Sequence, residues 1–315
     1  MGVFIVRRLL QGTLVLLLVS AFTFFLVNLA PGGPSAAVSL ERTAAEREAL
    51  LRQYGLDQPV GVRYLTWLGG VLRGDLGTSL SQGLPVGGLL LGRLGNTLQL
   101  ALSALALTAL FGVSLGVLAA VGKDRWPDYV ISSVATLGMS VPGFWLGIVG
   151  IIVFSVRLGW LPSSGIASIG ESFSLLDRAR HLALPAGVLA FTLMPNVVRV
   201  ARSAMLGVLS SDYVRTARAK GLPGRAVLLK HTFKNALVPV IAILGLITTV
   251  LFSGSVVIES VFSWPGLGRL AIEAANGRDY PVILGVTLVA GTVVVVVNLL
   301  VDILYAAVDP RISYD

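Results

Sequence analysis

The chain has 315 residues, of which 55% are apolar and only 13% charged, about half the charged share of an average soluble domain. Its net charge of +8 is concentrated near the N-terminus and in one central segment, a pattern of membrane topology rather than of a nucleic-acid-binding surface. There is no cysteine, and the only two histidines, His181 and His231, lie far apart. We therefore infer an integral membrane protein and expect no disulfide, no metal site and no nucleic-acid partner.

The N-terminal region predicts a first membrane span. Arg7 and Arg8 precede an apolar run at residues 9–30, which is long enough to cross a hydrocarbon core of about 30 Å. A cleavable signal peptide has a shorter apolar region of about 7–15 residues, so we favour an uncleaved span. By the positive-inside rule, the N-terminus then lies in the cytoplasm. Residues 1–30 therefore contain the cytoplasmic N-terminus and the first span.

A polar insert follows over residues 31–95. Thr43 and Glu46 match a capping box, which predicts a helix from residue 44 to near residue 55. A second helix is expected over 60–73, and it carries aromatic side chains that suit a membrane interface, Tyr64 and Trp67. The nearly balanced charge places the insert outside the cytoplasm. The sequence leaves open whether it serves packing or contacts an external partner.

Five further apolar segments complete an all-α chain with six predicted spans, at about residues 96–121, 129–156, 181–200, 236–261 and 282–306. In the second span, Gly112-x-x-x-Gly116 allows another helix to approach closely. Proline interrupts the third span at Pro142 and the fourth at Pro185 and Pro195, which is tolerated where neighbouring groups satisfy the freed backbone. Six spans put both termini in the cytoplasm, including the tail 307–315.

The segment between the fourth and fifth predicted spans is strongly basic. Residues 199–235 carry eight Lys or Arg and a single acid, Asp212, so this loop, with its core at 201–235, should face the cytoplasm. Ser210, Ser211 and Asp212 offer N-cap oxygens for a helix over 213–220, and Gly221 can end that helix in a left-handed conformation. A second helix is expected over 225–234. The loop either docks onto a partner or is a solvated segment that only fixes orientation.

Several functional motifs are excluded by the residues present. Gly122-Lys123-Asp124 resembles the end of a phosphate-binding loop, but the required earlier glycine is Val117 and the hydroxyl residue is Asp124. The acids Glu259 and Asp302 lie near the ends of predicted spans, whereas a proton-coupled carrier would use ionisable residues at mid-membrane. We therefore predict no catalytic residue in this chain.

The central loop carries a family resemblance. The segment Asp212-Tyr-Val-Arg-Thr-Ala-Arg-Ala-Lys-Gly221 resembles the cytoplasmic loop of ABC-transporter permeases in the dipeptide/oligopeptide B-subunit branch. The general permease pattern is Glu-Ala-Ala, three residues, then Gly; here Arg215-Thr216-Ala217 and Gly221 occupy those positions, so the Glu and the first Ala are absent. Further similar motifs run almost end to end, including Gly74-Asp-Leu-Gly-Thr-Ser79, Pro142-Gly-Phe-Trp145, the segment from Glu259 to Arg269, and Arg278-Asp-Tyr-Pro281.

The resemblance implies a type I ABC importer permease fold with an external insert between the first two helices. It also implies one permease subunit of a heterodimer with a second, homologous permease, two cytosolic ATPases and an extracytoplasmic solute-binding protein, in a bacterial inner membrane. ATP and Mg would be bound by the ATPases, and this chain would hold no cofactor. The expected cargo is a dipeptide or oligopeptide. Nickel chelates or glutathione are alternatives within the same machinery, and an ion-coupled secondary transporter is the alternative from another class.

The resemblance further implies two sets of functional residues. The ATPase-coupling segment would consist of Asp212, Tyr213, Arg215, Thr216, Ala217, Arg218, Ala219, Lys220 and Gly221. Within it, Ala217 would be small because it packs against the wall of the ATPase. Contacts with the binding protein, or an outer gate, would be formed by Arg73, Asp75, Glu259, Trp264, Arg278 and Asp279.

Overall fold

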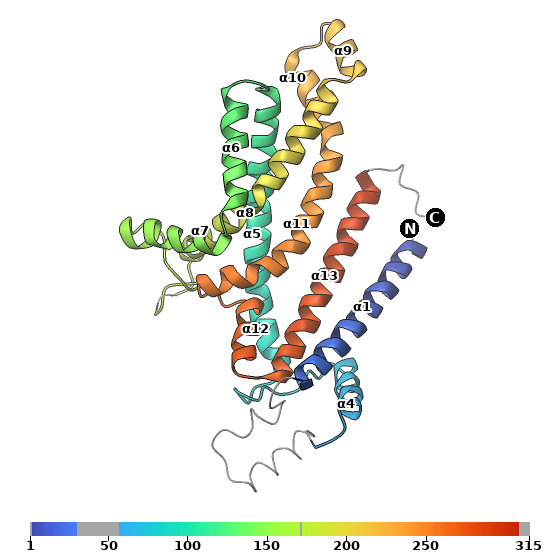
Figure 1. Cartoon of the computed structure of the whole chain (residues 1–315), viewed down its shortest axis with the longest axis vertical. Helices are drawn as coiled ribbons and strands as arrows, with labels where there is room; N and C mark the ends of the chain where they lie inside the picture. Colours follow the sequence, from blue (N-terminus) through green and yellow to red (C-terminus); the bar gives the residue numbers. More distant parts are fainter. Residues whose placement is uncertain (1, 30–56, 171, 309–315) are drawn as a thin grey trace. The chain divides into compact units, whose positions relative to one another are not determined.

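The structure is a computed structural model that describes residues 2–29, 57–170 and 172–308. The regular structure of this described part is helical, apart from an isolated bridge between Thr78 and Pro85, and loops and turns join the helices (Figure 1). The helix predicted at residues 44–55 lies outside the described residues. The segments labelled η are π-helical. The elements in chain order are α1 (Gly2–Leu29), α4 (Val60–Leu72), α5 (Val86–Val121), α6 (Trp126–Ser140), α7 (Gly143–Gly150), η1 (Ile151–Arg157), α8 (Leu175–Leu209), α9 (Asp212–Ala219), α10 (Gly224–Ala226), η2 (Val227–Phe233), α11 (Lys234–Val261), α12 (Leu267–Asn276) and α13 (Tyr280–Val308).

The described residues contain five helical segments that are long and apolar enough to cross a membrane: Phe4–Leu29, Val86–Val121, Leu175–Leu209, Gly224–Phe252 and Tyr280–Ile303. A sixth span is formed if Trp126–Ser140 and Gly143–Arg157 count as one, although these two are bent by 101° relative to each other (Figure 1). The bend lies at Pro142, whose extended backbone (ψ 135°) ends one helix before the next begins. The expected third span is therefore sharply broken.

Several predicted boundaries differ from those of the structure. Helix α8 runs without interruption through Pro185 and Pro195, both of which are buried, because packing on neighbouring helices compensates for a lost helical hydrogen bond. It also continues past residue 200 to Leu209, so the start of the expected loop is helical. At ~1.5 Å per residue its 35 residues span roughly 52 Å, so it extends beyond a hydrocarbon core of about 30 Å. Helix α5 begins at Val86, inside the expected insert.

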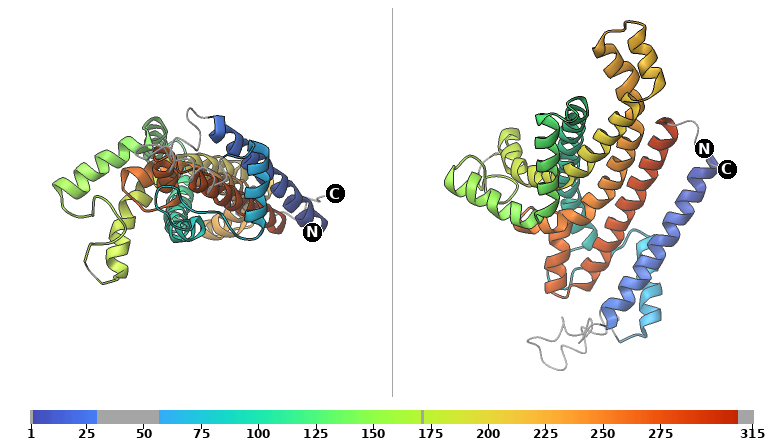
Figure 2. Two further views of the ribbon diagram at one scale, coloured as in Figure 1. Left: turned by 90° about the horizontal axis from the view of Figure 1, so that it is seen from below. Right: turned by 45° about the horizontal axis from the view of Figure 1, so that its top comes forward.

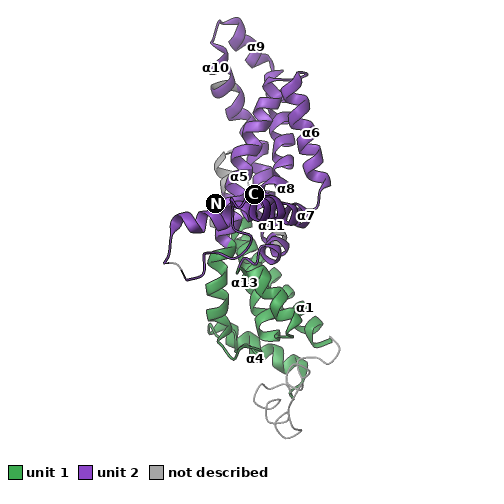
Figure 3. Cartoon of the chain, turned by 90° about the vertical axis from the view of Figure 1, so that its left-hand side faces the viewer, with its two compact units in different colours: residues 1–97, 265–299 green, residues 98–264, 300–315 purple. Residues whose placement is uncertain are grey.

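The chain divides into two compact units (Figure 3). Unit 1 comprises residues 1–97 and 265–299, and its core contains Val86, Leu90, Leu270 and Val282. Within this unit the predicted helix at 60–73 is confirmed as α4, which packs on α1. The Phe24 and Tyr64 ring centroids lie 5.4 Å apart, and the hydroxyl groups of Tyr64 and Ser20 are hydrogen bonded at 3.1 Å. The interfacial aromatics of the sequence thus join two helices.

Unit 2 comprises residues 98–264 and 300–315 and is organised around α8, which packs against α6, α7 and α11. The predicted close approach at the Gly112-x-x-x-Gly116 motif is observed, and the partner is α8. A Cβ atom at Gly112 would lie 2.8 Å from Cβ of Val197, and one at Gly116 would lie 2.6 Å from Cβ of Ala201. These glycines therefore permit the α5–α8 contact. The ends of α8 and α11 carry the short helices α9 and α10 (Figures 1 and 2).

Candidate functional site

The short helix predicted at residues 213–220 is present as α9, and its C-terminus has a complete cap. Gly221 adopts a φ of +76°, the left-handed conformation that glycine takes without a Cβ penalty. Its N–H donates to the carbonyl of Arg218 at 2.9 Å, and the N–H of Leu222 donates to the carbonyl of Ala217 at 3.3 Å. This pair of hydrogen bonds is the Schellman arrangement, so the sequence correctly located where the helix ends.

One face of α9 packs against the chain itself. Val214 and Ala217 are buried and form a small apolar cluster with Val227 of η2 and the partly buried Val208 of α8. The methyl group of Ala217 is therefore covered from within the chain, and its expected packing against an ATPase stays a prediction. Ala217 is small because α9 lies directly on α8 and η2.

Apart from Val214 and Ala217, the residues of α9 are exposed. We define the outward face of the helix as Asp212, Arg215, Thr216 and Ala219. Arg215 and Asp212 approach to 3.8 Å, with 72% and 98% of their side chains exposed, so this pair adds little stability. Tyr213 lies at the edge of this face, and its hydroxyl accepts a hydrogen bond from Nδ2 of Asn235 at 3.1 Å. The helix is thus fastened on one side and presents ionisable and hydroxyl groups on the other.

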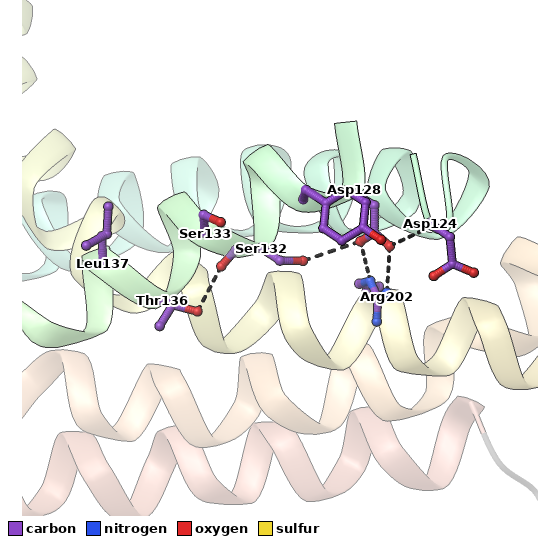
Figure 4. Close-up of a pocket in the computed structure, with 8 residues that line it drawn as sticks. Asp124, Asp128, Ser132, Ser133, Thr136, Leu137 and Arg202 are labelled. Carbon is purple, nitrogen blue, oxygen red and sulfur yellow. Dashed lines mark hydrogen bonds and ion pairs between the residues drawn. The ribbon is translucent and has the colours of Figure 1, made fainter. Parts of the chain in front are cut away.

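A second candidate site is a pocket of about 610 Å³ beside an ion pair that joins α6 to α8 (Figure 4). Nε and Nη2 of Arg202 donate to the two carboxylate oxygens of Asp128 at 2.6 and 2.7 Å. The backbone N–H of Asp124 and the hydroxyl of Ser132 donate to the same carboxylate at 3.2 and 3.3 Å. This bidentate geometry is the strongest form of an arginine–carboxylate contact.

Sequence reasoning missed this ion pair. It placed Asp128 between the predicted spans 96–121 and 129–156, and Arg202 in a basic loop, whereas both belong to helices and the Asp128 side chain is only 5% exposed. The available signal was an acid directly before the predicted third span, near a helix N-terminus, where the helix dipole favours it. One wall of the pocket is lined by hydroxyl residues of α6, namely Ser132, Ser133 and Thr136, which gives this apolar chain a locally polar surface.

Unit 1 contains four of the six residues expected at the outer contact or gate. Arg73, Asp75 and Arg278 are exposed, but Asp279 is buried. Its carboxylate accepts hydrogen bonds from the hydroxyls of Ser79 and Ser81, the latter at 2.6 Å. It also accepts from the backbone N–H groups of Leu80 at 3.1 Å and Ser81 at 3.0 Å. Asp279 therefore fastens the turn at residues 79–81 and is not itself a contact surface.

The surroundings of Asp279 also set its ionisation. Burial raises the pKa of its carboxyl, but the hydrogen bonds donated by Ser79, Ser81 and the backbone outweigh burial, and the pKa is lowered from its ordinary value. The carboxylate is therefore charged at neutral pH and holds all four donors.

The two remaining outer residues lie in unit 2 and are buried. Trp264 and Glu259 are both 0% exposed. The Trp264 ring belongs to the main apolar core of this unit, and its backbone N–H donates to the carbonyl of Glu259 at 2.8 Å. Both side chains are therefore covered from within the chain, and their expected role at an outer contact or gate stays a prediction.

These features define a multi-span helical membrane protein with a capped helix held between two long spans. The chain matches the family described as "Binding-protein-dependent transport system inner membrane component" over residues 112–314. It matches the N-terminal region described for such membrane components over residues 1–101. Together these matches cover most of its length, and the chain belongs to this family of inner membrane transport components.

Individual proteins agree with this assignment. The chain is 44% identical over 316 residues to the oligopeptide transport system permease protein AppB of Bacillus subtilis, covering 100% of both chains. It is 40% identical over 312 residues to the glutathione transport system permease protein GsiC of Salmonella choleraesuis, covering 99% of both. An inward-facing structure of the MetNI methionine ABC transporter matches 70% of this chain and 96% of its own with a TM-score of 0.58 and 19% identity. The predicted type I importer permease fold and the resemblance to ABC-transporter permeases are confirmed.

Proposed function

We propose that this chain is a membrane-spanning permease subunit of an ATP-driven, binding-protein-dependent importer of peptides. The similarity to an oligopeptide permease over the full length of both chains favours a dipeptide or oligopeptide cargo. A glutathione permease is nearly as similar, so glutathione, itself a small peptide, is the second candidate. Nickel chelates remain an alternative within the same machinery.

The proposal rests on the contacts that attach α9 to the rest of the chain. Because Val214 and Ala217 pack on Val227 and Val208, a force applied to the outward face of α9 is transmitted to α8. Helix α8 in turn contacts α6 through the pair between Arg202 and Asp128. Rigid attachments of this kind are what a partner ATPase needs in order to bias two states of the membrane helices.

The surrounding assembly follows from this proposal. A second homologous permease would complete the translocation path, and two cytosolic ATPases would bind ATP and Mg and receive α9. An extracytoplasmic binding protein would deliver the cargo. The basic segment around α9 favours the cytoplasm, which places both termini there and residues 57–85 outside. On that side, the exposed residues Arg73, Asp75 and Arg278 form the proposed contact with the binding protein.

The proposal is tested by reconstituting this chain with its second permease and its ATPases in nanodiscs. ATP hydrolysis is measured without binding protein, with empty binding protein and with peptide-loaded binding protein. The loaded protein should stimulate hydrolysis most, and the same complex in liposomes should accumulate peptide only with ATP. Peptide uptake by this chain without ATPases, driven by an ion gradient, would instead support a secondary transporter.

A further inference from the structure

A pocket of about 350 Å³ lies beside α9. The proposed function assigns no role to it. Part of its lining is apolar, including Val121, Leu209 and Leu228, and two arginines also line it, Arg218 and Arg225. No acidic residue is among the residues that line it. Val121 and Leu209 are the last residues of α5 and α8. The pocket therefore lies where two membrane-spanning helices end.

Arg215 and Arg218, the two arginines of α9, lie in different surroundings. Arg218 follows the buried Val214 by four residues and lies on the same side of the helix, where it lines the pocket while remaining exposed. Arg215 lies on the outward face, where it approaches Asp212. Within the described part of the chain, no carboxylate forms a salt bridge with Arg218 or Arg225. Two guanidinium groups thus share one pocket with an apolar wall and without a counter-charge.

We propose that this pocket binds the headgroup of an anionic phospholipid from the cytoplasmic leaflet. Planar guanidinium groups match the oxygens of a phosphate and hold it with charge-assisted hydrogen bonds. Basic pockets at the cytoplasmic ends of membrane helices are a recurrent site for such headgroups. The acyl chains would continue along the apolar ends of α5 and α8. This inference rests on the proposed function for its orientation.

The pocket combines positive charge with an apolar surface. This combination favours a lipid over another possible anionic ligand, an acidic patch of the ATPase. A carboxylate of the ATPase could pair with Arg218 and Arg225, but it would leave Val121, Leu209 and Leu228 uncovered. A phospholipid satisfies both parts, because its phosphate meets the arginines and its chain covers the apolar wall. The bound lipid would link the end of α8 to α9 and α10, and coupling would then depend on membrane composition.

The test uses the complete transporter with loaded binding protein in nanodiscs of phosphatidylcholine, with or without phosphatidylglycerol. The variant combines Arg218→Gln and Arg225→Gln, and the matched control is Arg215→Gln on the outward face of the same helix. Native mass spectrometry counts retained phosphatidylglycerol. The double variant should bind it roughly thirtyfold more weakly, since each of the two arginines contributes about 1 kcal/mol to such binding, whereas the control should retain as much as the unmodified protein.

Stimulated ATP hydrolysis in the same nanodiscs gives the functional readout. Phosphatidylglycerol should raise it several-fold for the unmodified protein but not for the double variant. Arg215→Gln serves as a control for lipid retention alone, because Arg215 lies on the face that is proposed to meet the ATPase. Inorganic phosphate added to phosphatidylcholine discs should not replace the lipid, and full replacement would overturn the lipid assignment. Equal retention by all variants would also overturn it, as would loss of ATPase pull-down by the double variant. Absence of stimulation in every lipid would contradict the proposed function, while the retention measurement would still decide the lipid site.

Discussion

At the scale of single residues, Gly221 gives the sharpest prediction. A β-branched side chain resists its φ of +76°, and the left-handed conformation costs an L-residue about 1–2 kcal/mol. Apart from the glycine itself and its chain neighbours, no atom lies within 4 Å of the place where a Cβ would be added, so the effect of Gly221→Val comes from the backbone alone. We expect α9 to fray at its C-terminus and stimulated ATP hydrolysis to fall.

The matched control is Gly207→Val in α8, where the added Cβ also meets nothing within 4 Å and φ is not positive. This variant should keep stimulated hydrolysis, and both variants should assemble with the ATPases in a pull-down. Full stimulation of Gly221→Val would show that the end of α9 has no part in coupling.

Asp279 gives a second prediction at this scale, which concerns pH. Because its pKa is lowered in the folded chain, its stabilising effect is fully present above the ordinary carboxyl pKa of about 3.9 and is lost as pH falls through the folded value. The hydrogen-exchange protection of the Leu80 and Ser81 amides should therefore be constant from neutral pH down to about pH 4. Asp279→Asn should lose that protection already at neutral pH.

The control for this measurement is Asp75→Asn. Asp75 is exposed, and its carboxylate accepts a hydrogen bond from the N–H of Gly77 at 2.8 Å, which an asparagine side chain can also accept. Protection of Leu80 and Ser81 should survive in that variant. Equal loss of protection in both variants would mean that Asp279 does not specifically fasten the turn.

At the scale of elements, the pair between Asp128 and Arg202 holds α6 against α8. Arg202→Gln leaves the Asp128 carboxylate buried without its cation, which costs about 3–5 kcal/mol. Adding Asp128→Asn removes the buried charge, so the double variant should unfold at a higher temperature than Arg202→Gln alone. Thermal unfolding of the purified chain in detergent measures both.

An exposed pair supplies the comparison. Arg269 and Glu273 lie 2.7 Å apart within α12, with 34% and 41% of their side chains exposed, so Arg269→Gln should cost at most about 1 kcal/mol. If Arg202→Gln were no more destabilising than Arg269→Gln, the pair could not act as a firm link between α6 and α8.

The sequence predicted most of these elements because long apolar runs and capping residues act locally. The end of α9 at Gly221 and the helix α4 depend on nearby residues, and both were located correctly. The uninterrupted passage of α8 through Pro185 and Pro195 depends on packing against other helices, which a local pattern does not contain. The 101° bend at Pro142 lies at an expected interruption, but its size is also set by tertiary packing.

The candidate site likewise contains some features that the sequence predicted and others that depend on residues far apart in the chain. Arg215 and Thr216 were expected in the coupling segment from the family resemblance, and both are exposed on α9. The burial of Ala217 against Val227 and the contact of Asp128 with Arg202 join residues 10 and 74 positions apart in the chain, and no local signal specifies such partners. For the same reason Asp279 was expected on a surface, although four hydrogen bonds from residues 79–81 surround it.

At the scale of the whole molecule, the proposed topology makes a simple prediction. Reporter fusions after Leu72 and after Gly224 should report opposite sides of the membrane, because the basic segment around α9 favours the cytoplasm. Periplasmic alkaline phosphatase and cytoplasmic fluorescence serve as complementary reporters. Identical sides for the two fusions would contradict the orientation on which the assembly rests.

The central claim is that the outward face of α9 meets the ATPase, and the absence of cysteine from the chain allows a direct test. A single cysteine is introduced at Thr216 on that face, or at the exposed Thr78 in unit 1 as a control, and each is treated with a short cross-linker in the assembled transporter. Thr216→Cys should cross-link to the ATPase and Thr78→Cys should not. A cross-link to the ATPase from Thr78→Cys, with none from Thr216→Cys in any nucleotide state, would contradict the account.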